Sequence, residues 1–172
     1  MRIADVMKND IVDCDNGFCV SVWLQGCPYH CKGCHNPQTW DFNSGKEIKN
    51  ENKFIEEILS YINENGIERN LSLLGGEPLC KERGNVDFSY KLLKAAKEKY
   101  PNIKTYVWTG STYEKLKKEI NNDIFNYIDI LIDGPFILEQ RDITLPLRGS
   151  SNQRVINIQE TIKQNKIITI ND

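Results

Sequence analysis

Three cysteines lie close together in the segment Cys27-Pro-Tyr-His-Cys31-Lys-Gly-Cys34, with the spacing C-x3-C-x2-C. Three thiolates on one short loop can hold a metal centre and leave one coordination position without a cysteine. Closed structural sites usually have four protein ligands, whereas reactive sites keep one position open. The loop is therefore compatible with a zinc site that His30 or His35 completes, or with a 4Fe–4S cluster whose fourth iron binds a small molecule.

The composition narrows the class of protein. The chain has 172 residues, which is the length of one domain, so we expect a single domain over residues 1–172. The formal net charge is -2 and no long basic run occurs, which argues against a nucleic-acid partner. No apolar run is long enough to span a membrane, and the N-terminus lacks the apolar region of a signal peptide. We therefore expect a cytoplasmic protein, in which clustered thiols are reduced and bind metal.

Elements that could position the cysteine loop follow from hydrophobic patterning. Helical spacing predicts a first helix over residues 51–65 and a second that has Asp87 as its N-cap and ends just before Pro101. A third is predicted over residues 111–120, where Ser111-x-x-Glu114 has the pattern of a capping box. Apolar runs predict strands over residues 18–24, 71–74, 103–108, 128–132, 153–158 and 167–170. Strands that alternate with helices predict an α/β fold with a mostly parallel sheet.

Polar and glycine-rich motifs follow the first four predicted strands. The cysteine loop follows the first, Gly75-Gly76-Glu77-Pro78 the second, Thr109-Gly110 the third and Asp133-Gly-Pro the fourth. Because ligands bind beyond the carboxyl ends of parallel strands, we expect these motifs to meet in one site. A functional edge of this kind favours the reactive iron–sulfur centre over a structural zinc clip.

The C-x3-C-x2-C loop followed by Gly75-Gly76-Glu77-Pro78 resembles the radical S-adenosylmethionine enzymes. Further motifs narrow the resemblance to the family of activating proteins of anaerobic ribonucleotide reductases: Cys34-His-Asn-Pro, Thr39-Trp40, Trp108-Thr-Gly110, Asp133-Gly-Pro-Phe136 and Leu147-Arg-Gly-Ser-Ser-Asn-Gln153. The resemblance implies an incomplete, laterally open (β/α) barrel. The length agrees with this, since a full barrel needs about 250 residues.

The resemblance also implies a set of site residues. Cys27, Cys31 and Cys34 would bind three irons, and the amino and carboxylate groups of S-adenosylmethionine would chelate the fourth. Many radical enzymes carry an aromatic residue just before the last cysteine, whereas this chain has a glycine there. The side chains of Arg148, Ser150, Ser151 and Asn152 are expected to bind ligand, partner or local backbone. The expected S-adenosylmethionine site comprises Gly33, Cys34, His35, Asn36, Gly75, Gly76, Glu77, Pro78, Thr109 and Asp133.

The implied activity is reductive cleavage of S-adenosylmethionine to methionine and a 5′-deoxyadenosyl radical, which generates a glycyl radical on anaerobic ribonucleoside-triphosphate reductase. The implied partners are that reductase and a one-electron donor such as a flavodoxin. Two alternatives stay open. One is a small radical enzyme acting on a metabolite, as in deazapurine synthesis, and the other is a zinc-binding interaction module.

Overall fold

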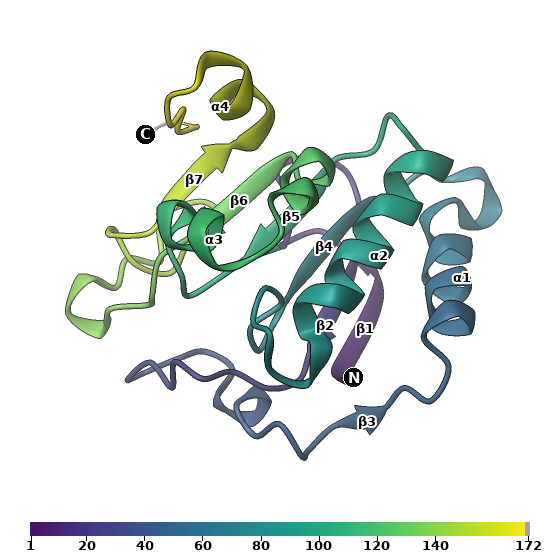
Figure 1. The fold of residues 1–172 in the computed structure, drawn as a ribbon, viewed down its shortest axis with the longest axis horizontal. Helices are drawn as coiled ribbons and strands as arrows, with labels where there is room; N and C mark the ends of the chain where they lie inside the picture. The colour runs from purple at the N-terminus through teal and green to yellow at the C-terminus, as the bar shows by residue number, and fades with distance from the viewer. Residues whose placement is uncertain (171–172) are drawn as a thin grey trace.

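The computed structural model describes residues 1–170, so the last two residues of the expected domain lie outside the described part. Strands and helices alternate along most of the chain, which confirms the α/β class (Figure 1). In chain order the elements are β1 Arg2–Asp10, β2 Cys19–Leu24, β3 Lys46–Glu47, α1 Glu51–Ile62, β4 Asn70–Gly75, α2 Asn85–Lys99, β5 Thr105–Trp108, α3 Tyr113–Glu119, β6 Ile130–Asp133, β7 Arg154–Asn157 and α4 Ile158–Gln164.

The strands form one open sheet in the order β3-β1-β2-β4-β5-β6-β7, with β3 and β7 at its two edges. The sheet is thus not closed into a barrel. The prediction of a mostly parallel sheet was wrong, because the sheet is mixed. The pairs β2–β4, β4–β5 and β5–β6 are parallel, whereas β1–β3, β1–β2 and β6–β7 are antiparallel.

Two features explain why the antiparallel pairs were not anticipated. The sequence of β1, from Arg2 to Asp10, alternates weakly because several of its charged side chains face solvent, as is common on antiparallel strands. The connection from β6 to β7 contains no α-helix, only a short 3-10 turn at Leu138–Gln140. Parallel neighbours need a crossover, usually a helix, and without one the chain returns in the opposite direction.

The two faces of the sheet have different roles. Side chains of β2 alternate, so that Val20 and Val22 join the main core with apolar residues of α1 and α2, while Cys19, Ser21 and Trp23 face the other way. Figure 1 shows α2 lying across the sheet over β4, with α1 beside it. The helices therefore cover one face and leave the opposite face available for a site.

Helix ends differ in detail from the predictions. α2 begins at Asn85 and places Asp87 in its first turn, so Asp87 is not the N-cap. The predicted capping box of α3 is absent, because Thr112 occupies the N-cap position and makes no side-chain cap bond. The predicted strand over residues 167–170 is reduced to one isolated bridge, between Thr169 and Ile156. Within residues 1–170, no helix has the length and apolar character needed to cross a membrane.

Candidate functional site

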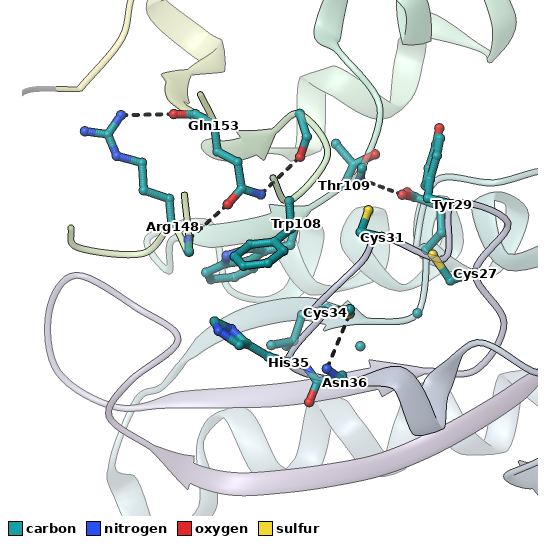
Figure 2. Close-up of a pocket in the computed structure, with 18 of the residues that line it drawn as sticks. Cys27, Tyr29, Cys31, Cys34, His35, Asn36, Trp108, Thr109, Arg148 and Gln153 are labelled. Atoms are coloured by element: carbon teal, nitrogen blue, oxygen red, sulfur yellow. Dashed lines mark hydrogen bonds between the residues drawn. The ribbon is translucent and has the colours of Figure 1, made fainter. Parts of the chain in front are cut away.

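One cavity of about 440 Å³ lies where the loops after β2, β4, β5 and β6 meet. This arrangement confirms the expectation that the four motifs converge. Nine of the expected site residues line it: Cys27, Cys31, Cys34, His35, Asn36, Gly75, Gly76, Glu77 and Thr109. Gly33, Pro78 and Asp133 are not among the lining residues. Figure 2 shows the cysteines on one side of the cavity, with Arg148 and Gln153 on the opposite side.

The cysteine loop leaves β2 at Gly26 and returns at Trp40. The Gly26 N–H donates to the Thr39 carbonyl at 2.8 Å, and the Cys27 N–H donates to the Trp40 carbonyl at 3.0 Å. Gly26 has φ +98, and a Cβ at this position would lie 2.1 Å from a ring carbon of Phe42. Only glycine satisfies both the backbone conformation and this close contact, so residue 26 fixes where the loop begins.

The three thiols of the loop are half-buried. Burial raises the pKa of Cys27 to about 11 and also raises the pKa of Cys31. A positive metal centre favours the thiolate and offsets this penalty. The Asn36 N–H donates to Cys34 Sγ at 3.4 Å, a contact that a thiolate ligand accepts more strongly than a thiol does (Figure 2).

The donor set fits an iron–sulfur cluster. Trp40 lines the same cavity, and its buried indole Nε1 has no hydrogen-bond partner within residues 1–170. Cluster sulfurs accept N–H donors of this kind, and such bonds tune the cluster potential. His30 stacks on Trp40 with ring centroids 4.9 Å apart and lies outside the cavity lining. In the described part of the chain, no three His, Cys, Asp or Glu side chains surround a point where a single metal ion would sit.

The remaining cysteines lie elsewhere. Cys14 and Cys19 are buried in a small apolar cluster, together with Tyr106, on the face of the sheet opposite α1 and α2. Cys80 is half-buried and does not line the cavity. The three clustered cysteines therefore line the cavity, and the other three do not.

The Gly75–Glu77 segment is bonded tightly to the cysteine loop. The Gly76 N–H donates to the Leu24 carbonyl and the Glu77 N–H to the Gly26 carbonyl, both at 2.8 Å. A Cβ on Gly76 would lie 2.3 Å from the Gly26 carbonyl oxygen. The absence of a side chain at residue 76 therefore lets the two loops approach each other.

Glu77 joins this segment to the loop after β5. Its carboxylate accepts the Gly110 N–H at 2.7 Å and the Leu79 N–H at 3.0 Å, and the residue is 1% exposed. Burial raises the pKa of Glu77 to about 7, despite these hydrogen bonds. The Thr109 side chain also bonds this carboxylate, and since a carboxylate has about four acceptor positions, about one remains for a cationic ligand.

Asp133 lies behind the cavity and holds α3. Its Oδ2 accepts the Tyr113 N–H at 2.7 Å, and its Oδ1 accepts Arg154 Nε at 2.9 Å. The Arg154 guanidinium also bonds Glu114 and holds the pKa of Glu114 at about 2. Asp133 thus supplies the cap expected from Ser111. Thr109 Oγ1 accepts the Ser111 N–H at 3.0 Å, so its hydroxyl also supports the local turn.

Residues after β6 complete the cavity. Arg148, Gly149 and Gln153 line it, and of these Arg148 is one of the residues expected to bind ligand, partner or backbone. Gln153 Oε1 accepts the Gly149 N–H at 2.9 Å, and its Nε2 donates to the Gly134 carbonyl at 3.0 Å. Asn152 Nδ2 donates to the Pro135 carbonyl at 2.8 Å. Local backbone is therefore bound by Asn152 and Gln153.

Several lining residues were not among the expected ones. Trp108 was noted only as part of a motif, and Asp13 was not noted at all. The signal for Trp108 was alternation along β5, which places it on the same face as Tyr106. No local signal marks Asp13, because the loop between β1 and β2 reaches the cavity through the overlooked antiparallel pairing. The other such residues are Val12, Trp23, Tyr29, Trp40, Leu74, Gly110, Gly134, Phe136, Leu145 and Leu147.

Comparison with known proteins agrees with the conclusion that the cysteine loop and its donors fit an iron–sulfur cluster. The family model of the 4Fe-4S single cluster domain matches residues 15–156. An anaerobic ribonucleoside-triphosphate reductase-activating protein of Haemophilus influenzae is 34% identical over 154 residues, covering 89% of this chain and 96% of the relative. The proteins of the same name from Escherichia coli K12 and Enterobacteria phage T4 are 32% and 31% identical, covering 87% and 79% of this chain and 94% and 81% of the relatives. The chain therefore belongs to the family of anaerobic ribonucleoside-triphosphate reductase-activating proteins.

Proposed function

We propose that this chain generates the glycyl radical of an anaerobic ribonucleoside-triphosphate reductase, using a 4Fe–4S cluster and S-adenosylmethionine. The observation that carries the proposal is the meeting of three thiols with the Gly75–Glu77 segment in one cavity. The name shared by the relatives supports the reductase as the protein substrate. We further propose that residues 1–172 form one domain of the radical S-adenosylmethionine type, with the open sheet as its incomplete barrel.

Cys27, Cys31 and Cys34 would hold the cluster, with N–H donors from Asn36 and Trp40 beside it. The chemistry that a bound cluster would supply is one-electron reductive cleavage of S-adenosylmethionine to methionine and a 5′-deoxyadenosyl radical, which would take a hydrogen atom from a glycine of the reductase. The apolar and aromatic lining limits access of water to this chemistry.

The remaining site residues would bind the amino-acid and nucleoside parts of S-adenosylmethionine. The backbone of Gly75 and Gly76 would approach the methionine portion, and the remaining acceptor position of Glu77 suits its ammonium. Thr109 and Asp133 stay proposed polar contacts, although both also hold local structure. The other proposed contacts are Gly33, Cys34, His35, Asn36 and Pro78.

The open sheet suits a protein substrate, because a cavity without a closing strand admits a loop of a larger partner. The electron donor would be a one-electron carrier such as a flavodoxin. We propose that both partners approach the cavity side of the sheet, opposite α1 and α2.

Metal analysis of protein purified without oxygen tests the cofactor. We expect about four irons and four sulfides per chain, a number set by the cluster type. Cys34→Ser should lose the cluster, whereas the matched variant Cys80→Ser should retain it, since Cys80 lies outside the cavity. Colourless wild-type protein with one zinc per chain would contradict the proposal.

Electron paramagnetic resonance tests the activity. Reduced protein, S-adenosylmethionine and the reductase should together give a glycyl radical signal, and omission of S-adenosylmethionine should abolish it. Formation of 5′-deoxyadenosine without a glycyl signal would instead favour a radical enzyme acting on a metabolite.

A further inference from the structure

Trp108 presents a fixed aromatic surface to the cavity. It ends β5, is partly exposed and lines the cavity. Its indole Nε1 donates to the Leu147 carbonyl at 2.7 Å, and its ring stacks at 28° on the fully buried Tyr106. Both contacts hold the indole in place, so its exposed face is organised before any ligand binds.

The Leu147 backbone adopts a costly conformation at this contact. Its φ is +62, in the left-handed region that side chains other than glycine rarely adopt. The hydrogen bond from Trp108 is accepted by the carbonyl of this same residue. Strained backbone persists where the surrounding structure requires it, and it is common at ligand sites.

His35 forms a second aromatic surface on the other side of the cavity. It directly follows Cys34, is exposed, and its ring lies 5.3 Å from the ring of Phe136. A Cβ on Gly149 would lie 3.3 Å from His35 Cε1 and 3.1 Å from Phe136. The segment from Leu147 to Gly149 therefore contacts Trp108 at one end and His35 at the other. Figure 2 shows both rings projecting into the cavity, with the imidazole below the indole.

We propose that Trp108 and His35 enclose the adenine ring of S-adenosylmethionine, an inference that rests on the proposed function. Flat aromatic surfaces bind nucleobases by stacking. Gly33 provides no ring before the last cysteine, and its φ of +77° lies in the left-handed region that side chains other than glycine rarely adopt. The base would therefore take its aromatic contacts from His35, directly after the last cysteine, and from Trp108, the last residue of β5.

The other tryptophans of the cavity are less suited to this role. Trp40 is stacked on His30, and its buried indole nitrogen lies on the side of the cysteine loop. Trp23 belongs to β2, next to the strand end from which the cluster loop departs. Both lie on the side that holds the cluster, whereas Trp108 follows from β5, two strands away in the sheet.

Calorimetric titration of the cluster-loaded protein without reductant tests this adenine slot between Trp108 and His35 independently of turnover. The probes are S-adenosylmethionine, 5′-deoxyadenosine and 5-deoxyribose, which lacks the base. Trp108→Leu should weaken binding of the first two by about 10- to 100-fold and leave 5-deoxyribose binding unchanged. The conservative variant Trp108→Phe keeps a ring and should stay within about fivefold of wild type. His35→Ala should weaken the same two probes, and His35→Phe should restore them.

Equal affinity of wild type and Trp108→Leu for 5′-deoxyadenosine, at full iron content, would overturn the inference and leave the proposed function standing. Failure of the loaded wild type to bind S-adenosylmethionine would overturn both. Since a partly perturbed variant could weaken all probes, the ratio of the Kd for 5-deoxyribose to the Kd for 5′-deoxyadenosine is decisive. This ratio should fall toward one in Trp108→Leu, and an unchanged ratio contradicts the adenine slot.

Discussion

The Glu77 carboxylate accepts the Gly110 backbone N–H at 2.7 Å and so connects the loop after β4 to the loop after β5. Glu77→Gln replaces one acceptor oxygen with an amide group that donates, which places it against a backbone donor. Leaving a buried polar group unsatisfied costs about 1–3 kcal/mol, so we expect a loss of that size in the free energy of unfolding of the cluster-free protein. Urea denaturation measures it.

The matched control is Glu82→Gln, because Glu82 is exposed and lies on the same connection between β4 and α2. It should unfold at the wild-type urea concentration. A Glu77→Gln protein as stable as this control would show that the Gly110 contact contributes nothing to stability.

Gly76→Ala tests the close approach of the two loops. The added Cβ would lie 2.3 Å from the Gly26 carbonyl oxygen, which is backbone and cannot rotate away. Overpacking of this kind costs about 1–3 kcal/mol, and the displaced cysteine loop should also bind less iron. Gly66→Ala is the control, since a Cβ there meets no atom within 4 Å and only the positive φ is penalised. Full iron content in Gly76→Ala would contradict the prediction.

Asp133→Ala removes a cap and an ion pair at once. Tyr113 N–H loses its acceptor, and Arg154 loses a carboxylate that is 1% exposed. Breaking a buried pair costs about 3–5 kcal/mol, and the partly exposed Arg154 places this case near 3 kcal/mol. Thermal and urea unfolding should both show it, while Asp123→Ala on the exposed surface should not. A change in S-adenosylmethionine affinity with unchanged stability would instead assign Asp133 to the ligand.

Asp13 should make stability depend on pH. Burial, with the neighbouring Asp10, raises the pKa of Asp13 from 3.8 to about 7. Between these values the native chain holds a proton that the unfolded chain has released, so this contribution to stability falls as the pH rises from about 4 to about 7. The free energy of unfolding of wild type should therefore decline more steeply between about pH 4 and about pH 7 than that of Asp13→Asn. Parallel curves for the two proteins would contradict the assignment.

The site could be predicted further than the fold. The apolar runs that became β2, β4, β5 and β6 each end in a polar or glycine motif, and parallel pairing alone brings those ends together. β1 was not predicted because its charged residues mask the alternation. Without β1, the position of Asp13 in the cavity lining could not be predicted either. The local pattern Ser111-x-x-Glu114 suggested a capping box, but the cap comes from Asp133 on another strand. Such long-range partners leave no local signal in the sequence.

The two backbone hydrogen bonds at Gly26 and Cys27 give the cysteine loop a closed base. Bringing the ends of a loop together costs chain entropy, and here that cost is met when the protein folds. Assembly of the proposed cluster would then need to order only the interior of the loop, from residue 27 to residue 36. If the loop holds the proposed cluster, the affinity of the chain for iron depends in part on Thr39 and Trp40, whose backbone carbonyls close the loop.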